Sequence, residues 1–157
     1  MEIDAFLCDS IVAAEGKLYA QGAGWNTVFS SNFPARHPRV GIGVLIRVPY
    51  TATNQTHQFE LHLEDSDGGR IALGEAVPGV PTEDGKVYTI TGDFNVGRPP
   101  LLPPGEIQMV PLAMNLDGLQ FDKPDAYTFN ISIDGTELKR LPIRLQHLAQ
   151  PGQVLQQ

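Results

Sequence analysis

The chain has 157 residues, of which 41% are hydrophobic and 18% charged, which fits one domain with its own core and excludes collagen, coiled coils and wholesale disorder. Eighteen Asp and Glu side chains against eleven Lys and Arg give a net charge of −7, which disfavours binding to nucleic acids and to anionic membranes. The apolar runs are too short to span a bilayer, and the acidic first residues do not resemble a signal peptide. We therefore expect a soluble, cytoplasmic protein.

Short runs of alternating apolar residues, separated by glycine and proline, indicate β-strands from the start of the chain. Two early runs are joined by Ala14–Lys17, which reads as a hairpin turn. Val44, Ile46 and Val48 form a buried row that ends at Pro49. No window of eleven residues keeps a helical pattern free of glycine and proline. The sequence predicts strands near residues 3–12, 17–24, 40–49, 57–65, 70–77, 86–96, 106–116, 126–134 and 137–146.

The later runs alternate most regularly. Apolar residues occupy every second position over Phe59–Leu63, Tyr127–Ile133 and Leu141–Leu145, so each run is expected to bury one face. Asp134-Gly135 separates the last two runs and supplies the positive φ angles of a tight hairpin. Antiparallel pairing follows, because no crossover helix is available to join parallel strands.

The predicted fold is therefore all-β: an antiparallel two-layer β-sandwich of about 8–9 strands, immunoglobulin-like or a related Greek key. Residues 32–39 and 97–105 are rich in proline and are expected to be irregular links between the sheets. We assign residues 1–146 to the sandwich domain and residues 147–157 to a flexible tail. Asp125–Tyr127 resembles a tyrosine corner, whose hydroxyl bonds back to nearby backbone; the alternative is a tyrosine that only begins a buried row.

Several motifs resemble those of a family of small, uncharacterised, single-domain bacterial proteins, mostly from high-GC species, that are described as a domain of unknown function. The resemblance covers nearly the whole chain and implies a bacterial cytoplasmic β-sandwich with no assigned catalytic residue. The motifs that carry it are Gly16-Lys17-Leu18-Tyr19, Gly22-Ala23-Gly24-Trp25, and Val96-Gly97-Arg98-Pro99-Pro100 followed by Leu102-Pro103-Pro104-Gly105.

No catalytic constellation is found. The chain has no Gly-x-Ser-x-Gly elbow, and the spacing of its four histidines matches no zinc pattern. Cys8 lies within a strand pattern and is expected to be a buried small hydrophobe rather than a reactive thiol. The glycine pairs at 22/24 and 41/43 lack the context of a phosphate loop, so close sheet contacts or bulges are favoured. No cofactor is expected.

Calcium is a weak alternative at Asp65 and Asp67, where acids and a glycine turn occur together. The helical calcium-loop template is incomplete there. The Asp-Gly pairs at 67/68, 84/85 and 117/118 are instead explained as turns.

Candidate binding residues lie in the irregular segments. Trp25 is the sole tryptophan. It is either an exposed anchor or a core residue, and the core position is favoured. Arg36, His37 and Arg39 form a small basic spot in an acidic chain, and Arg98 belongs to the proline link. Pro100–Pro103 in that link could offer a PxxP segment to an aromatic groove, although a crossover between sheets is favoured.

We therefore expect a non-enzymatic interaction module that binds another protein, or itself, through a strand edge. The alternative is a sandwich that binds a small ligand or carbohydrate, with or without calcium. An enzyme with an assembled pair of carboxylates is the third possibility.

Overall fold

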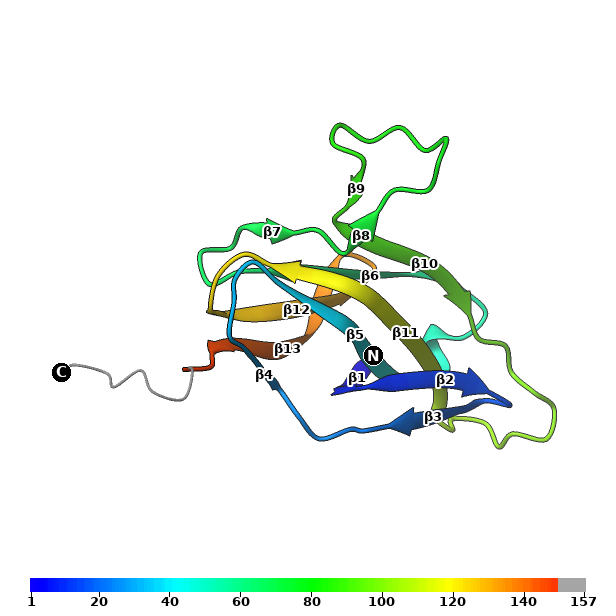
Figure 1. Cartoon of the computed structure of the whole chain (residues 1–157). Helices are drawn as coiled ribbons and strands as arrows, with labels where there is room; N and C mark the ends of the chain where they lie inside the picture. The colour runs from blue at the N-terminus through cyan, green and yellow to red at the C-terminus, as the bar shows by residue number, and fades with distance from the viewer. Residues whose placement is uncertain (150–157) are drawn as a thin grey trace.

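The computed structural model describes residues 1–149, which form thirteen β-strands and one 3-10 turn, η1 (Figure 1). No helix in this part of the chain is long and apolar enough to cross a membrane. The elements are β1 (Glu2–Cys8), β2 (Ser10–Ala14), β3 (Lys17–Gln21), β4 (Thr27–Ser30), β5 (Ala35–Val48), η1 (Tyr50–Ala52), β6 (Thr56–Glu64), β7 (Arg70–Ile71), β8 (Gly74–Glu75), β9 (Lys86–Val87), β10 (Thr89–Asn95), β11 (Gln108–Phe121), β12 (Asp125–Ile133) and β13 (Thr136–His147).

Two sheets build the body of the protein. The first has the order β1-β5-β11, and the second has the order β10-β6-β12-β13-β4. The short β7 pairs with β6 at Leu63 and Glu64, directly beyond the residues that pair with β10, so β7 continues the edge that β10 forms. Two smaller sheets are the hairpins β2-β3 and β8-β9. The strand pairs are antiparallel, except that β4 runs parallel to β13.

One core lies between the two large sheets. Alternate residues on both sheets point into it, because a strand turns successive side chains to opposite faces. Each apolar side chain that is fully buried in this way contributes about 1.5–3 kcal/mol to the free energy of folding. The rows with 4% exposure or less include Val40, Ile42, Val44, Ile46 and Val48 on β5, Phe59, Leu61 and Leu63 on β6, and Tyr127, Phe129, Ile131 and Ile133 on β12.

The long strands β5 and β11 exchange their buried face midway along their length. On β5, the even-numbered residues face the core from Val40 onward. Before that point the buried residue is the odd-numbered Ala35. On β11 the same change lies between Leu116 and Leu119, both buried, at Gly118 with φ +67°. The pairing register continues through this bend, so both strands turn together.

A third layer, the β2-β3 hairpin, covers the outer face of the first sheet. Glycines 41 and 43 permit its close approach: an added Cβ at Gly41 would lie 3.4 Å from the Cα of Ser10, and one at Gly43 would lie 2.7 Å from Ile11. The Asn115 side chain then accepts from the Ile11 N–H at 3.1 Å and donates to the Ile11 carbonyl at 2.8 Å. Cys8 is fully buried, as expected, and burial raises the pKa of its thiol.

The all-β prediction and most antiparallel pairs are confirmed. The Ala14–Lys17 turn joins β2 to β3, and Asp134-Gly135 joins β12 to β13. The proline link 97–105 carries the chain from β10 in one sheet to β11 in the other, as favoured. The Tyr127 hydroxyl donates to the carbonyl of Lys123 at 2.7 Å, which is the bond expected of a tyrosine corner.

Four boundaries are corrected. The expected strand 3–12 is divided at Asp9, whose N–H bonds to the carbonyls of Gln21 and Gly22 instead of continuing the first sheet. Residues 32–39 are not wholly irregular, since β5 starts at Ala35 and its first residues pair with β11. The expected strand 70–77 is divided into two short strands of two residues each, β7 and β8. The expected strand 106–116 extends to Phe121, so Asp117-Gly118 lies inside β11 and is not a turn.

Strand β4 has no counterpart in the sequence prediction. Its four residues pair with the last residues of β13, which places His147 in a strand, and the Leu148 N–H bonds to the Ser30 carbonyl at 2.8 Å. The folded part therefore extends past residue 146 into the segment assigned to a tail. The rest of that segment, residues 150–157, lies outside the described residues.

Candidate functional site

The two large sheets leave a seam along one side, where β11 faces β10 and β7. Strand β11 pairs only with β5, and β10 pairs only with β6, so within residues 1–149 each has one edge without a strand partner. An unpaired edge presents backbone N–H and C=O groups that can bond to another strand. Two clefts open along this seam, one polar and one apolar, and they are the candidate functional sites.

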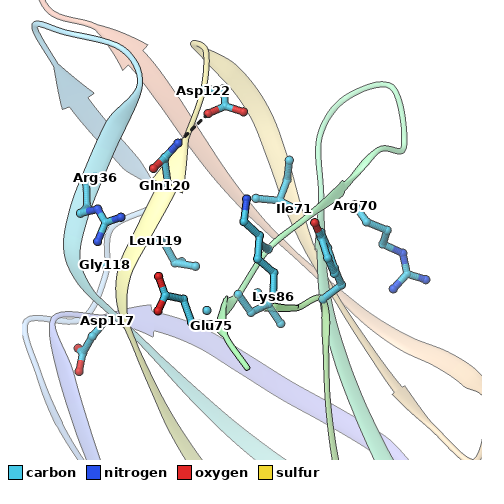
Figure 2. A pocket seen from close by; sticks show the side chains of 14 residues that line it. Arg36, Arg70, Ile71, Glu75, Lys86, Asp117, Gly118, Leu119, Gln120 and Asp122 are labelled. Carbon is cyan, nitrogen blue, oxygen red and sulfur yellow. Dashed lines mark hydrogen bonds between the residues drawn. The ribbon is translucent and has the colours of Figure 1, made fainter. Parts of the chain in front are cut away.

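The polar cleft, of about 440 Å³, lies where the end of β11 faces the segment from β7 to β9 (Figure 2). Leu119 and Leu73 are buried residues in its lining. The remaining lining is rich in charge of both signs: the cations are Arg36, Arg70 and Lys86, and the acids are Glu75, Asp117 and Asp122.

The cations of the polar cleft have no acid at ion-pair distance in residues 1–149, although Asp84 lies near enough to Lys86 for that cation to contribute to the lowered pKa of Asp84. None of Arg36, Arg70 and Lys86 forms an ion pair in the described part of the chain. Asp117 is instead held by Arg39, with Nε–Oδ1 at 2.6 Å, and the guanidinium lowers the pKa of that carboxyl. Figure 2 shows Arg36 and Lys86 on opposite sides of Leu119, whereas Arg70 points away.

The apolar cleft, of about 190 Å³, lies between β10 and β11 nearer the middle of the seam. Gly92 lies between Ile90 and Phe94 on one face of β10. A Cβ added at Gly92 would meet no heavy atom within 4 Å. The missing side chain therefore contributes to the hollow. The apolar lining consists of Phe59, Ile90, Phe94, Leu112, Ala113 and Met114, and Asp93 is its one charged residue.

A buried histidine, His57, contacts a residue that lines the apolar cleft. The ring of His57 packs 5.3 Å from the ring of Phe94. Its Nδ1 lies 2.7 Å from an Asp134 carboxylate oxygen, and its Nε2 lies 2.7 Å from the Ala52 carbonyl oxygen. Because both ring nitrogens face acceptors, the imidazolium is favoured. The Ala52 bond, with Asp134, raises the pKa of His57 despite its burial, and the bond from His57 lowers the pKa of Asp134.

The predicted basic spot is only partly brought together. Arg36 lines the polar cleft, and Arg39 pairs with Asp117 beside it. His37 packs against Trp25, with ring centroids 5.9 Å apart. Trp25 is not a core residue but is partly buried against the core, and its Nε1–H donates to the Gly22 carbonyl at 2.8 Å.

Arg98 lies away from both clefts and holds the proline link against η1. Its guanidinium carbon lies 3.9 Å from the centre of the Tyr50 ring, its Nε donates to the Thr53 hydroxyl at 2.6 Å, and an Nη donates to the Tyr50 carbonyl. These contacts give the Gly-Arg-Pro-Pro motif a structural function. Whether Arg98 also binds a partner stays a prediction.

The acidic loop after β6 is held by its own side chains. Asp65 Oδ1 accepts from the N–H groups of Asp67 and Gly69. Asp67 lies 3.8 Å from the Lys123 amine. No group of three or more His, Cys, Asp or Glu side chains in residues 1–149 could hold a metal ion. The calcium alternative at Asp65 and Asp67 stays a prediction.

The sequence reasoning missed most of the cleft residues. Lys86 and Glu75 lie on two-residue strands, and nothing in their local pattern distinguishes them from solvated charges. Gly92 carried a usable signal, because a glycine inside a strand often marks a site of close approach or missing packing.

No curated protein matches the sequence. A family model matches residues 3–146, which is nearly the entire described part of the chain, and its description is a family of unknown function. The chain therefore belongs to that family of unknown function, DUF6941.

Proposed function

We propose that the protein is a non-enzymatic interaction module that binds an extended segment of another protein along the seam between β10 and β11. The observation that carries the proposal is that two strand edges without partners border one apolar cleft. Strand addition at a sheet edge supplies backbone hydrogen bonds, and pockets for alternate side chains supply specificity.

The geometry of the cleft suggests how the partner would be recognised. A strand lying against β10 would turn every second side chain towards the core side of the seam. There the hollow beside Gly92 is bordered by Ile90, Phe94 and Leu112. We expect the partner segment to carry an aliphatic or aromatic residue at this position, with further apolar residues two positions away.

The charge of the chain favours a basic partner over a second copy. Each molecule has a net charge of −7, so two copies repel one another. Asp93, the charged residue of the apolar cleft, lies on β10 itself. A partner strand with Lys or Arg at its solvent-facing positions would complement this edge.

A library of random extended peptides, panned against the protein, tests the proposal. The informative variant is Gly92→Leu, because the strand there has an extended backbone and an added side chain enters open space. We expect peptides with alternate apolar residues and net positive charge to be enriched on the wild-type protein and to lose at least tenfold in affinity on Gly92→Leu, which is about 1.4 kcal/mol.

Lys139→Gln on β13 serves as the matched control, since it changes a charge outside both clefts. Its peptide affinity should equal that of the wild type. The proposal is wrong if no peptide is enriched, or if the enriched peptides bind Gly92→Leu as tightly as they bind the folded wild-type protein.

The setting of this module is also a proposal. The motifs around Trp25 and Arg98 resemble those of small bacterial proteins, and a single buried cysteine suits a reducing cytoplasm. The tyrosine-corner bond of Tyr127 supports a distant relation to immunoglobulin-like sandwiches.

A further inference from the structure

We infer that the polar cleft is a separate binding site for a small polyhydroxylated anion, of the chemical class of sugar phosphates and sugar acids. The cleft's volume of about 440 Å³ lies within the range of small-molecule sites. Strand β11 borders both clefts, but the polar cleft shares no lining residue with the apolar cleft, so the inference does not rest on the proposed partner strand.

Two cations on opposite walls define the place of the anionic group. Arg36 comes from β5 and Lys86 from β9, and they lie on either side of Leu119 (Figure 2). Within residues 1–149 neither forms an ion pair, although the chain has seven more acids than cations. A carboxylate or phosphate between them would receive charge-assisted hydrogen bonds, which are about twice as strong as neutral ones.

The rest of the lining accounts for the hydroxyl groups of the ligand. The Glu75 carboxylate borders the cleft, and the carboxylate of Asp122 accepts from the Gln120 amide at 3.1 Å at its far end. Carboxylates accept hydrogen bonds from hydroxyls, and they repel a ligand that carries only negative charge. Ile71, which is only half-buried, gives the cleft an apolar surface against which the carbon face of a sugar ring would lie.

The two cations and the carboxylate acceptors together favour a ligand that has both an anionic group and hydroxyl groups. Inorganic phosphate would meet the cations but has no sugar hydroxyls to donate to the Glu75 and Asp122 carboxylates. A neutral sugar would meet the acceptors but would offer no anionic group to Arg36 and Lys86. A molecule with both parts satisfies both sets of groups, and we therefore expect it to bind more tightly than either fragment.

The test is an amide NMR titration of the whole chain with four probes: glucose 6-phosphate, gluconate, glucose and inorganic phosphate. We expect saturable shifts around Leu119 and Lys86 with glucose 6-phosphate or gluconate, at roughly millimolar concentrations or below. Glucose and inorganic phosphate should each bind at least roughly tenfold more weakly. The better of the two anionic sugars then shows whether the cations are matched to a phosphate or to a carboxylate.

Arg36→Gln and Lys86→Gln should each weaken that binding at least roughly tenfold, which is the loss of one charged contact. Lys139→Gln, which removes a cation outside the cleft, and Gly92→Leu, which fills the apolar cleft, should leave it unchanged. The inference is overturned if neither anionic sugar gives saturable shifts, if inorganic phosphate alone binds equally well, or if folded Arg36→Gln and Lys86→Gln variants both bind like the wild type. Failure of peptide binding in the preceding experiment would leave this result unaffected.

Discussion

The two clefts lie on one seam and are bordered by one strand, β11, yet their chemistry is opposite. The cleft beside β10 is lined almost entirely by apolar side chains. The cleft beside β7 and β8 is lined by three cations and three acids. The change occurs at the bend near Gly118, where β11 exchanges the face that it buries.

The difference shows how one uncovered edge can serve two kinds of recognition. Before the bend, the inward row of β11 is Leu112 and Met114, which leaves apolar atoms at the seam. After the bend, Leu119 turns into the core and Gln120 turns outward, so polar groups border the seam. An apolar cleft suits a peptide side chain, whereas a charged cleft suits a polar small molecule.

The largest expected effect compares two leucines of β11, one beneath each cleft. Leu119 is 2% exposed, so Leu119→Ala should lose about 3 kcal/mol of unfolding free energy. Leu112 is only partly buried, since the apolar cleft lies beside it, and Leu112→Ala should lose about 1 kcal/mol. Urea unfolding of the two variants measures the difference. Equal losses would mean that the apolar cleft is closed in solution.

The next effect compares two glycines, one in each cleft. Gly118 has φ +67° and a neighbouring Arg36 atom 3.4 Å from an added Cβ, so Gly118→Ala should cost about 1–2 kcal/mol. Gly92 has an ordinary extended backbone and open space, so Gly92→Ala should be neutral or up to about 1 kcal/mol stabilising. Thermal unfolding of both variants gives the sign directly. A destabilised Gly92→Ala variant would contradict the open cleft.

The smallest expected effect is a pH dependence of the free energy of unfolding, which arises from His57 beside the apolar cleft. The raised pKa of His57 means that its bonds to Ala52 and Asp134 stabilise the fold fully below the ordinary value of 6.5. This stability is lost as the pH rises through the raised pKa of the folded state. The lowered pKa of Asp134 acts in the opposite direction, and its contribution is lost only as the pH falls through the acid range.

Unfolding free energies measured from about pH 6 to about pH 9 should therefore decline in the wild type and change less in His57→Gln. No histidine lines the polar cleft, so Arg36→Gln should keep the wild-type profile. A profile of His57→Gln that falls as steeply as that of the wild type would show that another group is responsible.

The strands with strict alternation could be predicted from sequence because one of their faces is buried along the whole length. Phe59–Leu63 and Tyr127–Ile133 are of this kind; the hairpin of β12 with β13 was expected, whereas the pairing of β12 with β6 was not predicted. Strand β4 could not be predicted, because its Phe29 is 58% exposed and its pairing with β13 is a tertiary contact. The start of β5 was also missed, since Pro34 and Pro38 suggested a link, and the bend shifts the phase of alternation there.

The site was less accessible to sequence reasoning than the fold. Arg36 was selected for its place in a basic spot, and it does line a cleft. Its proposed counterpart, Lys86, lies 50 residues away in a segment that has no pattern of its own. Only the return of the chain along the free edge of β11 brings the two together. Residues that meet through tertiary structure leave no local signal.

The central claim is that β10 and β11 have free edges at the seam, and amide hydrogen exchange of the unbound protein tests it most directly. On a strand paired on one side, every second N–H points outward to solvent. We predict that alternate amides in Thr89–Asn95 and Leu112–Met114 exchange rapidly, whereas those of Thr128–Ile133 in β12, which are paired on both sides, are protected. Uniform protection of β10 and β11, at the level of β12, would contradict the account.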